Sequence, residues 1–213
     1  MELKKFIVGI NETNTYIIYE TNTLEAFVID PGDEEKALMQ YIDRNSLNLK
    51  AIILTHYHHD HIGAAEELKK KYNAPIYAHK KEIEGLKDPE INHSKHKTRK
   101  AISIVPDKIL SDGDIIAVTD IFLEVIHTPG HTPGGMCLKV KDANIIFTGD
   151  TIFSDDLGRT DLVGGNEEIL KKTIMNKVSK WSDETIIYPG HGEASVMKEM
   201  RRKNIPYLSL KGC

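Results

Sequence analysis

Short hydrophobic runs separated by turn residues cover most of this chain and predict β-strands. The runs are rich in β-branched residues, and Gly, Pro, Asn or Asp lie between many of them. The three nearest the N-terminus predict a meander of neighbouring strands. The predicted strands span residues 6–10, 15–20, 26–30, 51–55, 74–79, 108–111, 115–119, 121–128, 136–140, 144–149 and 185–190.

Helical spacing of apolar residues predicts helices between these strands. Residues 33–46 have this spacing, and residues 63–72 are strong helix formers. Residues 166–181 predict an amphipathic helix with Asn166 as its N-cap, and residues 195–204 predict a basic helix. The order of elements predicts an α/β architecture of sheets packed together with helices on the outside.

Length and composition predict one globular domain, residues 1–213. The net charge of −4 comes from both signs spread along the chain, so we expect no nucleic-acid partner. No run approaches the roughly 20 apolar residues that cross a bilayer, so we expect no membrane partner. Two cysteines and an N-terminus without a signal-like apolar segment predict a reduced, cytoplasmic protein.

Four predicted strands end just before residues that commonly bind metals. The strand 51–55, apolar as far as Thr55, precedes four histidines and one aspartate within six positions, and later strands precede further candidates. The carboxyl ends of strands often carry catalytic groups because a rigid sheet holds the loops there. Imidazole and carboxylate ligands suit zinc, iron and manganese. The candidates are His56, His58, His59, Asp60, His61, His131, Asp150 and His191.

These residues lie in motifs that resemble those of the metallo-β-lactamase-fold hydrolases. The resemblance covers essentially the whole chain and implies a four-layer αββα sandwich with a metal site at one edge of its two sheets. It rests on T-H-x-H-x-D-H at 55–61, T-P-G-H-T-P-G-G at 128–135, F-T-G-D-T at 147–151 and Y-P-G-H-G at 188–192. Two further motifs, G-R-T-D-L-x-G-G at 158–165 and R-x-N-x-P-Y-L at 202–208, are similar to those of the short glyoxalase-II-like group.

The resemblance implies two divalent metal ions, with zinc expected first and iron or manganese as alternatives. The matched ligands are His56, His58 and His131 for the first ion, Asp60, His61 and His191 for the second, and Asp150 as the bridge. His59 falls at a variable motif position and is not expected to be a ligand. Asp30 matches an aspartate that hydrogen-bonds a ligand histidine and fixes its tautomer, although a simple turn-forming role before Pro31 is an alternative.

The other histidines have less specific surroundings. His127 lies in a predicted strand, where we expect it to pack or to support a ligand. Three more lie in polar sequence and are expected to be exposed: His79, His93 and His96.

By resemblance, the expected activity is hydrolysis of a small hydroxyacylglutathione-like thioester by a metal-bridging hydroxide, with Asp60 as both ligand and catalytic residue. Arg159 is a candidate to bind a substrate carboxylate, since guanidinium binds carboxylate in a bidentate manner; a surface ion pair is the alternative. About 20 residues follow His191, too few for the helical extension that supplies glutathione contacts in full-length glyoxalase II enzymes. Another small thiol is therefore possible.

Other activities on the same fold define the alternatives. A persulfide dioxygenase would hold one iron by two histidines and an aspartate. A hydrolase of another small ester or phosphoester, or a metal-binding module without activity, would use the same ligands. Many class B β-lactamases with two zinc ions have cysteine where Asp150 stands, which argues against antibiotic hydrolysis.

Overall fold

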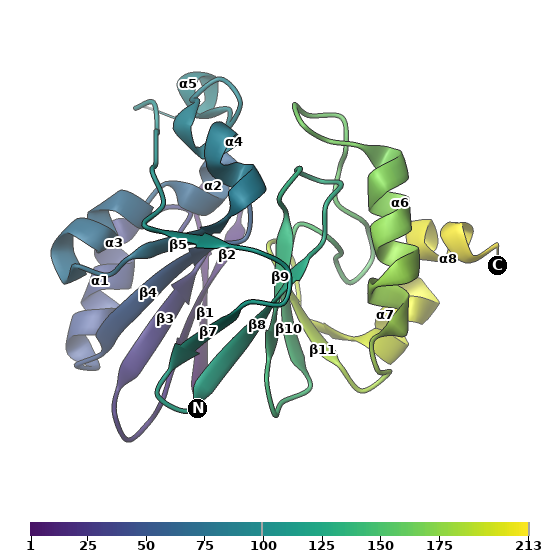
Figure 1. Cartoon of the computed structure of the whole chain (residues 1–213). Coiled ribbons are helices and arrows are strands. Elements are labelled where there is room, and N and C mark those ends of the chain that lie inside the picture. The colour runs from purple at the N-terminus through teal and green to yellow at the C-terminus, as the bar shows by residue number, and fades with distance from the viewer. Residues whose placement is uncertain (99, 213) are drawn as a thin grey trace.

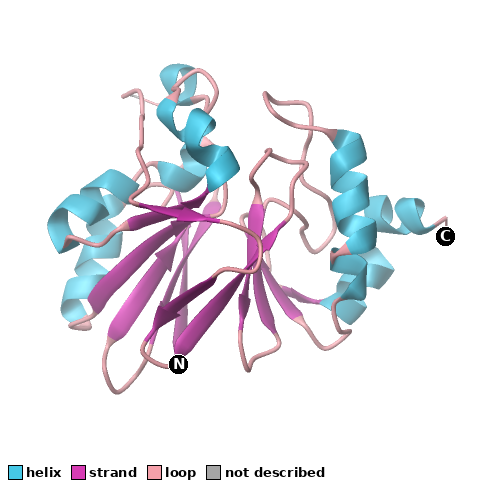
Figure 2. Cartoon of the chain, viewed as in Figure 1, coloured by secondary structure: helices cyan, strands magenta, loops and turns pink. Residues whose placement is uncertain are grey.

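The computed structural model describes residues 1–98 and 100–212. Two six-stranded sheets pack face to face, and helices cover the outer face of each (Figure 1). Figure 2 shows the resulting order of helix, strand, strand and helix layers. The predicted four-layer αββα architecture is confirmed.

The first sheet contains the N-terminal half of the chain in sequential strand order. The first three strands are antiparallel, and β3 to β6 run parallel. Its strands are β1 (Glu2–Val8), β2 (Thr13–Tyr19), β3 (Glu25–Ile29), β4 (Asn48–Leu54), β5 (Ile76–His79) and β6 (Lys108–Leu110). Helices α1 (Glu35–Arg44) and α3 (Ala65–Tyr72) lie on its outer face.

The second sheet contains the C-terminal half. Its strands are antiparallel except for the parallel pair β10 and β11. They are β7 (Ile115–Val118), β8 (Ile121–His127), β9 (Met136–Val140), β10 (Ile145–Gly149), β11 (Ile186–Pro189) and β12 (Ser195–Val196). The helices on its outer face are α6 (Glu167–Asn176), α7 (Met197–Lys203) and α8 (Ile205–Lys211).

Strand β4 shows how the apolar runs divide between two cores. Ile52 and Leu54 pack in the core beneath α1 and α3. Ala51 and Ile53 point the other way, into the core between the two sheets. Because successive side chains alternate between sheet faces, a strand buried on both sides must be apolar at every position. This burial fixes the place where the histidine-rich loop begins.

Some elements differ from the sequence-based expectation. β1 lies at Glu2–Val8 and stops before Gly9, whose φ of 66° begins a turn. Residues 80–97, where no strand or helix was predicted, contain a 3₁₀ turn (Lys80–Glu82) and helices α4 (Ile83–Lys87) and α5 (Ser94–Lys97). Helix α8 and the short helix α2 (His59–Ile62) were also not predicted. The predicted cap of α6 is present, since Asn166 Oδ1 accepts a hydrogen bond from the Ile169 amide at 2.9 Å.

Among the helices of the described residues, none has the length and apolar character needed to cross a bilayer.

Candidate metal centre

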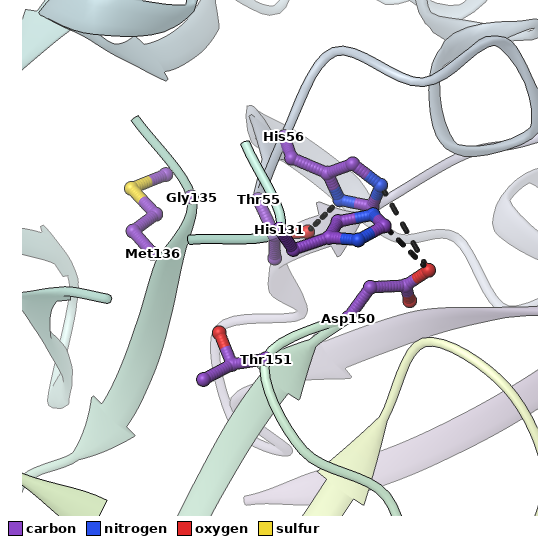
Figure 3. A pocket seen from close by; sticks show the side chains of 7 residues that line it. All are labelled: Thr55, His56, His131, Gly135, Met136, Asp150 and Thr151. Atoms are coloured by element: carbon purple, nitrogen blue, oxygen red, sulfur yellow. Dashed lines mark hydrogen bonds and ion pairs between the residues drawn. The ribbon is translucent and has the colours of Figure 1, made fainter. Parts of the chain in front are cut away.

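The seven predicted ligands converge where the two sheets meet. The loop after β4 together with α2 supplies four of them, and loops of the second sheet supply three. Figure 3 shows the rings of His56 and His131 directed at the carboxylate of Asp150, which follows β10. The members from the first sheet are His56, His58, Asp60 and His61, and those from the second are His131, Asp150 and His191.

Two groups of three side chains form within this set, as the motifs imply. In the first, His58 Nδ1 lies 2.9 Å from His131 Nε2, and the His56 ring packs against both. In the second, His61 Nε2 lies 3.2 Å from His191 Nε2, which is 3.6 Å from Asp60 Oδ2. With metal–nitrogen bonds of about 2.0–2.1 Å, two nitrogens on a tetrahedral ion lie about 3.3 Å apart. Both groups therefore fit a metal ion.

Asp150 lies between the two groups. Its Oδ2 is 3.6 Å from His131 Nε2 of the first group and 3.5 Å from His191 Nε2 of the second. Its Oδ1 is 3.5 Å from His61 Nε2. One carboxylate thus faces both candidate ion positions, which is the arrangement expected of a bridging ligand.

Four of the histidines are oriented by hydrogen bonds on the ring nitrogen that faces away from the centre. Such bonds fix the tautomer, so that the inward nitrogen presents a lone pair. The outer partners of Nδ1 are Thr55 Oγ1 for His56 (3.1 Å), Asp30 Oδ2 for His61 (3.0 Å), the Arg159 carbonyl for His131 (2.7 Å) and the Asn11 carbonyl for His191 (3.0 Å).

Two inward atoms are buried without a hydrogen-bond partner among the described residues. They are Nε2 of His56 and Oδ1 of Asp150. Leaving a buried polar atom unpaired costs about 1–3 kcal/mol, so native proteins rarely do it. A cation at the centre would satisfy both atoms, and the chemistry of the donor set fits divalent ions.

Asp30 makes the predicted hydrogen bond to a ligand histidine. Its Oδ2 lies 3.0 Å from His61 Nδ1 and accepts the Thr55 hydroxyl at 2.6 Å, while its Oδ1 accepts the Thr55 amide at 2.7 Å. Both carboxylate oxygens are therefore engaged away from the ion positions. Asp30 ties the end of β3 to the first residue after β4 and orients His61.

The charges at the centre suit metal binding. Burial, the largest effect, lowers the pKa of His56 and of His58 well below the usual value, so both rings are neutral. Burial opposes ionisation of Asp150, but His61 and the other surrounding histidines outweigh it and hold the pKa of this carboxyl well below its usual range. Burial also disfavours the charged form of His61, but Asp150 together with Asp30 outweighs this effect and raises the pKa of His61 to about 10. An ion would displace that proton on binding.

Arg159 and His59 lie outside the ligand set. The Arg159 guanidinium is 61 % exposed and binds Asp161 in a bidentate manner, with Nε–Oδ1 and Nη2–Oδ2 distances of 2.8 and 2.7 Å. The surface ion pair considered for Arg159 is thus the arrangement present. His59 is half-buried, with its Nδ1 3.7 Å from Asp60 Oδ1.

The expectation that His79 is exposed is wrong. Only 2 % of its surface is exposed, because the last residue of β5 meets the last residue of β8, and its ring stacks on that of His127 at 4.2 Å. His93 is half-buried, with its Nε2 buried against the protein. The prediction of exposure is confirmed for His96, and that of packing for His127.

Sequence reasoning also missed residues that support the centre. Asn11 Nδ2 donates to Asp60 Oδ2 at 2.9 Å, and the Thr13 hydroxyl lies 3.4 Å from the same oxygen. Glu82 is a fully buried carboxylate that contacts two of the ligand loops. Glu82 follows two lysines, and nothing local in that sequence indicates burial.

A groove of about 910 Å³ borders Asp60. Its wall includes Ile10, which is 96 % exposed, and the charged residues Asp33, Glu35, Glu66, Glu67, Lys97 and Lys100. The groove therefore offers both apolar and charged surface beside the candidate centre.

This fold and this ligand set define a class of protein. The family model of the Metallo-beta-lactamase superfamily matches residues 8–191, and the chain belongs to that family. It is a metallo-hydrolase of this superfamily, with a His/Asp site suited to divalent ions.

Particular relatives extend over nearly the whole chain. The Probable metallo-hydrolase YqgX of Bacillus subtilis is 35 % identical over 98 % of this chain and 98 % of its own. Hydroxyacylglutathione hydrolase GloC of Haemophilus influenzae is 34 % identical over 87 % of this chain and 88 % of its own.

Solved structures agree with the fold. BLEG-1 B3 metallo-beta-lactamase has a TM-score of 0.90 and 33 % identity, covering 97 % of this chain and 99 % of that one. TTHA1623 in a di-iron-bound form has a TM-score of 0.84 and 27 % identity, covering 95 % of this chain and 98 % of that one.

Proposed function

We propose that this protein is a cytoplasmic hydrolase of small hydroxyacyl thioesters that works with two divalent metal ions. The observation that carries the proposal is the position of Asp150, whose Oδ2 is 3.6 Å from His131 Nε2 and 3.5 Å from His191 Nε2. A mononuclear site needs only one of the two ligand groups. The convergence of both on one carboxylate supports a binuclear centre.

Bound ions would polarise the substrate carbonyl and make water nucleophilic near neutral pH. The chain's own residues hold the reacting groups in place. Asp60, held by Asn11 and Thr13, would orient the attacking water, and Asp150 would join the two halves of the centre. A thiol leaving group has a pKa of about 8.5, so it can leave as the thiolate with little need for protonation by an acidic side chain.

The substrate class rests on the relatives and on the groove. A similar protein is named as a hydroxyacylglutathione hydrolase, and this chain shares 34 % identity with it. The groove beside Asp60 gives room for a substrate, and its wall carries Lys97 and Lys100 among a larger number of acidic side chains. Zinc is the proposed metal, although a similar structure was solved in a di-iron form.

One observation favours a second candidate, β-lactam hydrolysis. The solved structure with a TM-score of 0.90 is that of a B3 metallo-beta-lactamase. Its similarity weakens the sequence argument that Asp150 excludes antibiotic hydrolysis.

The test combines metal analysis with three assays. The purified protein should contain two metal ions per chain and hydrolyse lactoylglutathione. Persulfide-dependent oxygen uptake with a single iron would establish the dioxygenase instead, and rapid nitrocefin turnover without thioester hydrolysis would establish the lactamase. Absence of bound metal after loading with zinc, iron or manganese would reject the proposal altogether.

A further inference from the structure

Glu82 is a buried carboxylate outside the ligand set. It ends the 3₁₀ turn after β5, and its side chain has no exposed surface. The preceding Lys80 and Lys81 are both exposed. A carboxylate is costly to bury unless hydrogen-bond donors replace the lost water, so the partners of Glu82 indicate its role.

The two oxygens of Glu82 bind the two loops that carry the first group of ligands. Oε2 accepts the backbone N–H of Tyr57 at 2.7 Å, and Oε1 accepts the backbone N–H of Gly134 at 2.6 Å. Tyr57 lies between His56 and His58, and Gly134 lies three residues after His131. A single side chain therefore spans the loop of the first sheet and the loop of the second.

The side chains of Glu82 and Tyr57 are tightly packed against neighbouring glycines. A Cβ atom on Gly134 would lie 2.7 Å from Glu82 Oε1, and one on Gly85 would lie 2.2 Å from the Tyr57 ring. The neighbouring Asn92 carbonyl accepts the backbone N–H of His59 at 3.0 Å. The segment after β5 thus holds the backbone on both sides of His58.

We propose that Glu82 is a positioning residue that sets the separation of His58 and His131 and so the metal affinity of the first group. Burial raises the pKa of the Glu82 carboxyl to about 8, so the placement of its two oxygens, rather than a full charge, suits this bridging task. The inference rests on the proposed metal centre. Glu82 has no bond to Asp60, His61 or His191, so the second group should depend on it much less.

The test is Glu82→Gln, measured by chelator-competition titration and by the visible absorption of the cobalt(II)-loaded protein. Glutamine has one acceptor oxygen, so one of the two N–H groups would face an NH₂ donor instead. Loss of an outer partner typically weakens metal binding by about 10–100-fold. We expect that loss for one ion per chain, a changed cobalt spectrum, and a second ion bound with near-normal affinity.

Glu20→Gln is the matched control. Glu20 also accepts two backbone N–H groups, from Asn22 at 2.8 Å and Thr23 at 2.7 Å, but at the end of β2 remote from Thr13 and Asp60. It should leave both affinities unchanged. Glu82→Asp, which keeps the carboxyl group but cannot span both loops, serves as the second variant if Glu82→Gln fails to fold.

The outcomes separate this inference from the proposed function. If the natural protein binds two ions and the Glu82 variants bind both with unchanged affinity and spectrum, Glu82 has no positioning role. Equal weakening of both ions, in step with a lower melting temperature, would also overturn it and indicate general destabilisation. A natural protein that binds no metal would overturn the proposed function and this inference together.

Discussion

At the scale of single residues, the pattern of strand ends was informative because ligand chemistry is local. His56, Asp150 and His191 each directly follow a predicted strand, and the structure brings all three together. Glu82 could not be found in this way. Its partners lie 25 and 52 positions away and are backbone groups, which carry no side-chain signature.

Replacement of the proposed bridging residue gives the first prediction. Asp150→Ala removes the carboxylate shared by both groups, so metal content and thioesterase activity should fall together, activity by more than about 100-fold. The far-ultraviolet circular dichroism should be retained. Asp155→Ala, an exposed aspartate of the following loop, is the control and should keep its metal. Full activity in Asp150→Ala would contradict the bridging role.

His79 gives a prediction about pH. Burial, with smaller effects of His127 and nearby lysines, lowers the pKa of His79 to about 4 in the folded chain. The unfolded ring titrates near 6.5, so the unfolded state binds more protons between these values and stability falls as pH drops from about 6.5 to 4.

His79→Phe keeps the ring stack but removes this titration. As pH drops over the same window, the free energy of unfolding of His79→Phe should fall by about 2 kcal/mol less than that of the natural protein, as measured by urea denaturation. His96→Phe, at an exposed position, is the comparison. Identical pH profiles for the natural protein and His79→Phe would refute the assignment.

At the scale of elements, strands were predicted more reliably than boundaries or short helices. The alternation of β4 between two cores requires a continuous apolar run, and such runs are visible in a sequence. Helix α2 is only four residues long and has no period to detect. β1 lay earlier than predicted because Gly9, with positive φ, ends it and leaves Ile10 in a turn.

The loop that carries Arg159 gives a prediction about substrate binding. If its guanidinium binds the substrate carboxylate, Asp161 competes for it in the free protein. Arg159→Ala should then raise KM about 10-fold with little change in kcat, and Asp161→Ala should lower KM. The Arg159 carbonyl that accepts from His131 is retained in both variants. An unchanged KM in Arg159→Ala would mean that Arg159 does not bind substrate and only forms a surface ion pair with Asp161.

The cap of α6 gives a stability prediction. Asn166 Oδ1 accepts the Ile169 amide, so Asn166→Ala should reduce the free energy of unfolding by about 1 kcal/mol. Denaturation should report this loss while the metal content stays equal to that of the natural protein. Asn166→Asp, which keeps an acceptor at the cap, should recover most of the stability. A metal-poor Asn166→Ala protein would mean that α6 also supports the centre.

At the scale of the whole molecule, each ligand group draws two members from the first sheet and one from the second. His56 and His58 meet His131, while Asp60 and His61 meet His191. No short-range pattern specifies this docking, which depends on the shared core between the sheets. The sequence indicated the layers through resemblance, whereas the contacts across the core required the structure.

Metal removal should therefore lower the stability of the whole fold. Ligand binding at 100 times the dissociation constant stabilises a fold by about 2.7 kcal/mol. A chelator should lower the melting temperature of the natural protein by several degrees and leave that of Asp150→Ala almost unchanged. An equal fall in both would mean that the ions do not hold the sheets together.

The division of ligands between the sheets has a consequence for the order of events during synthesis. The N-terminal half emerges first and carries four candidate ligands, but the first group is completed only when the loop with His131 docks, and the second only when His191 docks after β11. A partly made chain therefore has an unfinished centre. If the proposed function is correct, hydrolysis can begin only after the last strands of the second sheet have docked against the first.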